Sequence, residues 1–171
     1  MMARGPRQRN QYRRRVSGET DYRRRLKLLK SGQPRAVVRI SNTRAVCQIV
    51  TWDKDGDKVS VSATGDDLVT KYGWPEENSR KNIPASYLTG FALGKSAISS
   101  GVDEAVLDIG LAASSSGSRV FAALKGMVDA GLEIPHGDNV LPSEDRINGA
   151  HIDDSYTKAI EATKKKIEGA F

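Results

Sequence analysis

The segment Gly90-Phe-Ala-Leu-Gly94-Lys95-Ser96 contains the residue types of a phosphate-binding loop, in which backbone amides and a lysine hold nucleotide phosphates. Its spacing argues against that chemistry, because the loop needs four residues between its glycines and this segment has three. It also lies inside a helical pattern of apolar residues, whereas a phosphate loop follows a strand. We therefore predict that Gly90 and Gly94 mark a close contact between two helices.

Other residues suited to catalysis or metal binding are sparse. His136 and His151 have no cysteine partner and no second histidine four residues away, so a metal site is not expected. The serine run before Gly117 lacks the Gly-x-Ser-x-Gly pattern of a hydrolase nucleophile. The pairs Asp66-Asp67 and Asp153-Asp154 fit the starts of helices, where carboxylates are favourable. We expect no enzyme activity, no cofactor and no small-molecule substrate.

The N-terminal segment points to a different chemistry. Residues 1–30 contain nine arginines and two lysines, and the phrase Tyr12-Arg-Arg-Arg15 recurs as Tyr22-Arg-Arg-Arg25. Arginine makes bidentate contacts with phosphate and stacks on bases, which favours nucleic acid over a membrane surface or a heparin-like polyanion. Tyrosines beside the arginine triplets are suited to stacking on exposed bases, a feature of RNA more than of duplex DNA.

The charge is divided sharply along the chain. Residues 1–44 hold 14 basic and two acidic side chains, whereas residues 45–171 hold 13 basic and 19 acidic ones. A single cysteine, Cys47, excludes an internal disulfide and a cysteine-rich zinc site, and we interpret it as a small buried hydrophobe. The sequence has no apolar run long enough to span a bilayer and no signal-peptide pattern. We expect a cytoplasmic protein without a membrane partner.

The elements that must position these residues begin at Pro34. Residues 1–30 have too few apolar residues to build a core, so we expect a largely disordered segment whose residues 21–30 are the most helix-prone. Alternating β-branched residues then predict strands over residues 35–41, 44–51 and 58–64, joined by turns into an antiparallel meander. Alternation places Val37 and Arg39 on one face and Val38 and Ile40 on the other.

The remainder of the chain alternates helices with one strand. We predict a short helix over 66–71, a long helix from the cap Asn82 to Gly101, a buried strand over 105–109 and a helix over 119–130 capped by Ser118. Residues 132–153 look irregular, and 155–168 form a last amphipathic helix. This succession predicts a layered α/β domain over residues 34–153, preceded by a basic RNA-binding arm (1–33) and followed by a helix (154–171) that packs on or extends it.

Several sequence blocks resemble one protein family. The blocks are Tyr12-Arg-Arg-Arg, residues 18–35, Val37-Val-Arg39 with Ser41-Asn42, Tyr72-Gly-Trp74, residues 84–90, residues 107–111, residues 117–126 and residues 129–136. In this order they resemble the archaeal and eukaryotic branch of the 5S-rRNA-binding ribosomal proteins of the large subunit, family eighteen. The resemblance covers about nine tenths of the chain.

That resemblance implies a non-enzymatic component of the central protuberance of the large ribosomal subunit. It would hold 5S rRNA to the large-subunit rRNA beside neighbouring ribosomal proteins, including the large-subunit protein of family five. The implied fold is a three-layer ribonuclease-H-like domain with a mixed sheet, preceded by an extended basic N-terminal arm. Nucleases of that fold need an acidic residue on the first strand, and Arg35 to Ser41 contains none. A free regulatory or assembly RNA-binding module remains the alternative.

The expected RNA-binding residues lie in the arm, on the first two strands and in the loop before the helix at 119. The family often carries a basic residue and a proline before Gly117, whereas this chain has Ala112-Ala-Ser-Ser-Ser116, so contacts there would come from hydroxyls, amides or Arg119. The full set is Arg4, Arg7, Arg9, Tyr12, Arg13, Arg14, Arg15, Tyr22, Arg23, Arg24, Arg25, Lys27, Lys30, Arg35, Arg39, Asn42, Arg44, Ser116, Gly117, Ser118 and Arg119.

Overall fold

A four-stranded mixed sheet forms the centre of the protein. The computed structural model describes residues 5, 7 and 9–171. Strands β1 (Arg35–Ile40), β2 (Ala45–Thr51) and β3 (Lys58–Thr64) form the predicted antiparallel meander. Strand β4 (Val106–Asp108) joins β1 in parallel, so the strand order is β3-β2-β1-β4. The predicted α/β class is confirmed.

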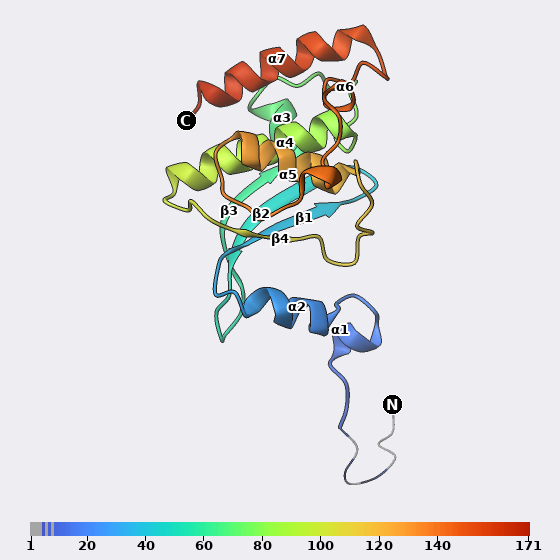
Figure 1. Cartoon of the computed structure of the whole chain (residues 1–171), viewed down its shortest axis with the longest axis vertical. Helices are drawn as coiled ribbons and strands as arrows, with labels where there is room; N and C mark the ends of the chain where they lie inside the picture. Colours follow the sequence, from blue (N-terminus) through green and yellow to red (C-terminus); the bar gives the residue numbers. More distant parts are fainter. Residues whose placement is uncertain (1–4, 6, 8) are drawn as a thin grey trace.

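One face of the sheet carries the core. Ala36 and Val38 on β1 lie opposite Ile49 and Cys47 on β2, and all four side chains are fully buried. Helices α4 (Ile83–Ser99) and α5 (Arg119–Asp129) cover this face (Figure 1). Alternate residues therefore point to the other face, which carries the arginines of β1, as the sequence predicts.

Helices α4 and α5 contact each other through glycines. A Cβ atom on Gly90 would lie 2.0 Å from the carbonyl oxygen of Ala123, and one on Gly126 would lie 2.1 Å from that of Tyr87. These distances leave no space for a side chain, so the two backbones touch. The prediction of close packing at Gly90 and Gly94 is confirmed, since a Cβ on Gly94 would meet Ala130 at 2.6 Å. The segment is helix, and it forms no phosphate-binding loop.

The C-terminal helix α7 (Asp154–Glu168) lies over α4, on the side away from the sheet (Figure 1). Tyr156 packs edge-on against the buried Trp74 at 5.9 Å between ring centroids, and Lys164 sits 5.0 Å above the Phe91 ring. The shorter elements are α3 (Gly65–Thr70), the 3-10 helix η1 (Asp138–Val140) and α6 (Glu144–Ile147). In α3, Asp67 and Thr64 form a capping box, which confirms the helix-start interpretation of the Asp66-Asp67 pair.

Two helices of the N-terminal segment lie on the opposite side of the sheet from α4 and α5 (Figure 1). They are α1 (Arg13–Val16) and α2 (Tyr22–Leu29). Asp21 caps α2 by accepting hydrogen bonds from the amides of Arg23 and Arg24, as predicted. The prediction that residues 21–30 are the most helix-prone part of the segment is confirmed, whereas the expectation of a largely disordered segment does not hold for α1 and α2. The reason is the cap together with contacts to the sheet that sequence alone does not show.

Candidate nucleic-acid interface

A network of arginines and aspartates occupies the face of the sheet that α4 and α5 leave uncovered. The parallel register of β1 and β4 pairs Val37 with Asp108, so Asp108 lies between Arg35 and Arg39 on the same face. Arg35 Nη1 donates to Asp108 Oδ2 at 2.8 Å, and Arg39 Nη2 donates to Oδ1 at 3.0 Å. Arg39 Nη1 also donates to the Asp108 carbonyl oxygen at 2.6 Å. The strand register therefore fixes both guanidinium groups.

Asp57, at the end of the β2–β3 turn, extends this network to the arm. Arg25 of α2 donates through Nη2 to both carboxylate oxygens of Asp57, at 2.7 and 2.8 Å. Arg35 Nη2 donates to Asp57 Oδ2 at 2.6 Å, so one carboxylate bridges a helix of the arm and a strand of the sheet. A continuous chain of charged hydrogen bonds runs from α2 to β4.

Both aspartates have pKa values below their ordinary value. Burial of Asp57 acts to raise its pKa, but hydrogen bonds from Arg25 and Arg35 together outweigh that effect. Burial of Asp108 likewise opposes ionisation, and the charge and hydrogen bonds of Arg39, with further bonds from the Gly110 amide and Arg35, lower its pKa. Both carboxylates are therefore ionised at neutral pH.

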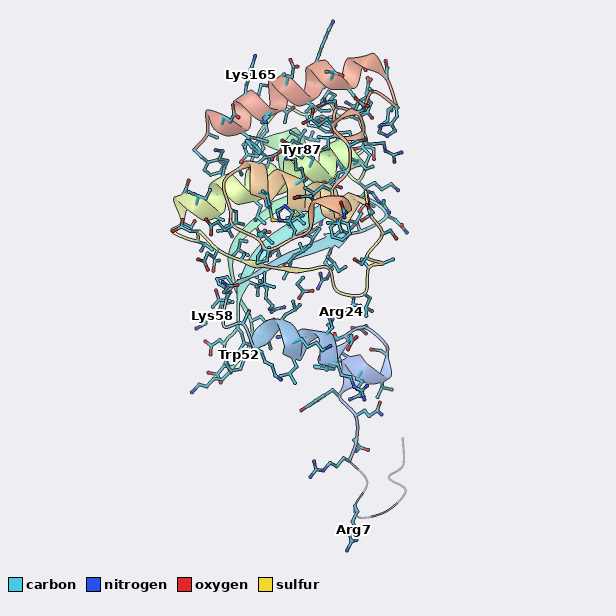
Figure 2. All side chains as sticks on the ribbon, viewed as in Figure 1. Arg7, Arg24, Trp52, Lys58, Tyr87 and Lys165 are labelled. Carbon is cyan, nitrogen blue, oxygen red and sulfur yellow. The ribbon has the colours of Figure 1, made fainter. Side chains whose placement is uncertain are left out.

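A cleft of about 940 Å³ lies between the arm helices, β1 and the loop that follows β4. Five arginines line it: Arg14 of α1, Arg24 and Arg25 of α2, Arg39 of β1 and Arg119 of α5. Arg24 reaches across to donate from Nη1 to the Gly110 carbonyl oxygen at 2.7 Å, and Figure 2 shows it between α2 and the sheet. The cleft brings together a subset of the predicted residues from the arm, the first strand and the loop before α5: Arg14, Tyr22, Arg24, Arg25, Arg39, Ser118 and Arg119.

The arm presents most of its cations without carboxylate partners. Arg14 pairs with Glu19 at 3.4 Å, and Arg25 pairs with Asp57. Among the described residues, eight other basic side chains of the arm have no ion-pair partner: Arg7, Arg9, Arg13, Arg15, Arg23, Arg24, Lys27 and Lys30. Arg7 lies far from the sheet in Figure 2. Arg4, also predicted as a contact, lies outside the described residues.

The two predicted tyrosines of the arm pack against each other. Their ring centroids are 5.1 Å apart with a tilt of 39°, and Tyr12 remains 71% exposed. One face of the Tyr12 ring is thus available for stacking, while Tyr22 is half-buried. The pair links the segment before α1 to α2.

The three predicted strand arginines have different surroundings. Arg35 is only 3% exposed, so in this conformation its guanidinium cannot meet RNA directly, and its place in the network is structural. Arg39 is half-exposed at the cleft. Arg44 is also half-exposed but pairs with Asp66, which accepts a second bond from Arg80.

Some of the predicted residues in the turn between β1 and β2 and in the loop before α5 already bond to other parts of the protein. Asn42 is exposed, and its carbonyl accepts from Lys81 Nζ at 2.6 Å. Ser116 Oγ donates to the Asn139 carbonyl oxygen, and the Gly117 amide donates to the Val140 carbonyl oxygen. Both donors therefore already have hydrogen-bond partners within the protein. Ser118 is at the N-cap position of α5 as predicted, but its side chain makes no capping bond. Arg119 is exposed and has no ion-pair partner among the residues described.

Sequence reasoning missed the two acidic members of the network. Asp57 lies in the predicted turn between residues 51 and 58, and turn sequence alone does not show that its carboxylate holds Arg25 and Arg35. Asp108 was assigned to a buried strand without a role. A charged residue on a short apolar strand is itself a signal, because a buried carboxylate requires a partner.

Other candidate sites have ordinary surroundings. His136 and His151 are exposed, and nowhere in the described part of the chain do three or more His, Cys, Asp or Glu residues gather as a metal site would need. Cys47 is fully buried, which raises the pKa of its thiol to about 12 and confirms its interpretation as a small core residue. None of the described helices has the length and apolar character needed to cross a membrane.

Comparison with known proteins identifies the family. The family described as ribosomal large subunit proteins 60S L5 and 50S L18 matches residues 6–104 and 99–137 of this chain. The chain belongs to this family. The match includes the arm from residue 6 onward, all four strands and α5, and it confirms the resemblance seen in the sequence blocks.

Archaeal members of the family are similar over most of their length. Each of three relatives is named large ribosomal subunit protein uL18, and each aligns with 88% of this chain. The protein of Methanothermobacter thermautotrophicus is 51% identical over 77% of its length, and that of Haloferax volcanii is 50% identical over 80%. The protein of Methanoculleus marisnigri is 48% identical over 85% of its length.

Proposed function

We propose that this protein is a structural constituent of the large ribosomal subunit that binds 5S rRNA and anchors it to the large-subunit rRNA in the central protuberance. Family membership carries the ribosomal part of the proposal, because relatives that share about half of their residues with this chain are named as large-subunit proteins. The proposed partners are 5S rRNA, large-subunit rRNA and neighbouring ribosomal proteins, including that of family five. The proposed location is the cytoplasm, within the large subunit.

The proposed mechanism is binding without chemistry. The unpaired cations of the arm neutralise phosphates and supply affinity, while the cleft beside Arg39 and Arg119 recognises the shape of folded RNA. In this proposal residues 1–33 act as an arm, 34–153 as the domain with an RNA-binding face, and 154–171 as a packed C-terminal helix. The net negative charge of residues 45–171 limits nonspecific coating of the domain by RNA.

We propose a ribonuclease-H-like fold for the domain, without nuclease activity. The order β3-β2-β1-β4, with β4 parallel to β1, supports this assignment. A metal-dependent nuclease holds its ions with clustered carboxylates, one of them on the first strand. Here β1 contributes Arg35 and Arg39, and both bond to Asp108, so the carboxylate nearest that position already has cationic partners.

Co-sedimentation separates this proposal from a free regulatory or assembly RNA-binding module. A structural constituent should remain with large subunits through a moderate-salt wash and sucrose-gradient centrifugation. A regulatory module should instead be found mainly at the top of the gradient, and that result would overturn the proposal. Washed ribosomal proteins of both subunits serve as internal markers for the same gradient.

A further inference from the structure

Two carboxylates of the domain, Asp57 and Asp108, line the arginine-rich cleft that we propose binds RNA, in addition to Glu19 and Asp21 of the arm. Like charges repel, so an aspartate beside a bound phosphate weakens binding unless it performs another task. Asp57 is bonded to Arg25 and Arg35, and Asp108 is bonded to Arg35 and Arg39. Each carboxylate therefore fixes two guanidinium groups in space.

We infer that Asp57 is a positioning residue that docks α2 on the sheet before RNA binds, so that the arm presents its arginines as a fixed array. The inference rests on the proposed RNA-binding function. Its basis is the path of the contacts: Asp108 holds the buried Arg35, Arg35 holds Asp57, and Asp57 holds Arg25 of α2.

Helix α2 has few other means of staying in place. It has eight residues, too few to be stable as an isolated helix in water. None of its residues, all of which the structure describes, is buried, and Leu26 is 57% exposed. Its apolar side chains Tyr22, Leu28 and Leu29 are only half-buried, so the polar contacts made by Arg24 and Arg25 add the fixed, directional part of its attachment to the sheet. The side chains of Arg25 and Asp57 are each 28% exposed, so solvent screens their pairing less than it screens a fully exposed pair.

Docking and simple charge repulsion predict opposite effects for the loss of Asp57. If only charge mattered, removing a carboxylate from this face would strengthen RNA binding. If docking matters, the apparent dissociation constant rises in inverse proportion to the fraction of molecules with α2 in place. A fall of that fraction from nearly all molecules to about one fifth gives roughly fivefold weaker binding. The sign of the change decides between the two.

The experiment compares Asp57→Asn with the matched control Asp55→Asn. Both variants lose one negative charge from the same turn, but Asp55 is exposed and has no ion pair among the described residues. Binding of an in vitro transcribed archaeal 5S rRNA is measured at fixed salt. We expect Asp57→Asn to bind roughly three- to tenfold more weakly and Asp55→Asn to bind as tightly as the unaltered chain or slightly more tightly. Equal or tighter binding by Asp57→Asn overturns the inference, whereas failure of the unaltered chain to bind overturns the proposed function.

Backbone amide hydrogen exchange in the absence of RNA tests docking directly. In Asp57→Asn the amides of residues 22–29 should lose protection while those of β2 and α4 keep theirs, because Arg35 retains Asp108 as a partner. Unchanged protection of α2 contradicts the inference.

A double-mutant cycle removes dependence on any one variant. Arg25→Ala should weaken binding more than Arg23→Ala, although each removes one cation from α2. Adding Asp57→Asn to Arg25→Ala should cause no further loss, because the docking contact is already absent. Additive losses would show that Asp57 acts independently of Arg25, which overturns the inference.

Discussion

Deletion of residues 1–30 should leave a folded domain that has lost most of its RNA affinity. Neither α1 nor α2 contributes a buried residue, and Arg35 keeps both Asp57 and Asp108 after the deletion. The sheet and its covering helices therefore remain. The deleted segment contains eleven basic and two acidic side chains, so its removal takes the net charge from +6 to −3. A truncated chain of negative net charge should be repelled by RNA at long range.

The magnitude follows from the arm cations that lack a carboxylate partner. Eight such side chains are among the described residues of the arm. If half of them contact phosphate, their loss reduces the slope of log affinity against log salt by about 3. Over a rise from about 50 to about 200 mM potassium chloride, the intact chain should then lose roughly 60-fold more affinity than the truncated chain.

Fluorescence anisotropy with labelled 5S rRNA across this salt range measures both affinity and slope. A chain with Lys158→Ala and Lys165→Ala is the matched control, because both lysines are exposed on α7, and that helix lies at the opposite end of the protein from the arm helices α1 and α2 (Figure 1). Its slope should stay close to that of the unaltered chain. Circular dichroism must show that the truncated chain unfolds cooperatively. If it binds 5S rRNA with unchanged affinity and slope, the arm has no role in this contact.

Three further predictions concern packing and ionisation. Gly90→Ala should lower the free energy of unfolding by about 1 to 3 kcal/mol through overpacking against α5, whereas Gly137→Ala, which has open space, should change it little in urea melts. Lys95→Ala should leave RNA binding nearly intact; magnesium-dependent ATP or GTP binding abolished by this change would contradict the helix interpretation. The free energy of unfolding should stay nearly level from pH 7 to about pH 4 and fall below it, because the lowered pKa values of Asp57 and Asp108 let the unfolded chain take up protons first. In urea melts, the free energy of unfolding of Asp57→Asn should fall less steeply in acid than that of the unaltered chain. An equally steep fall would show that Asp57 does not contribute to the acid dependence.

Local patterns in the sequence were enough to predict most of the elements. Alternation in residues 35–64 predicted the meander and the face of Val38, and Asn82 marked the start of α4. The two glycines of α4 predicted a close helix contact, since glycine allows backbones to touch. These features depend on neighbours in sequence or on one helix face, so the residues themselves carry the information.

The arrangement of the arm was not predictable in the same way. Arg25 and Asp57 are 32 positions apart, and Arg35 and Asp108 are 73 apart, so each pairing depends on strand order. An arginine-rich segment considered alone repels itself and is expected to be disordered. The parallel pairing of β4 with β1 places Asp108 beside Arg35, and this contact fixes the arginine that holds Asp57. The burial of Arg35 was missed for the same reason.

The central claim is that this protein binds 5S rRNA as part of the large subunit. The most direct measurement is ultraviolet crosslinking of the intact protein in its own cells, followed by sequencing of the attached RNA. The account predicts that 5S rRNA and large-subunit rRNA dominate, with crosslinked peptides from the arm and from the cleft near Arg39 and Arg119. Crosslinks mainly to messenger RNA or to small-subunit rRNA would contradict it.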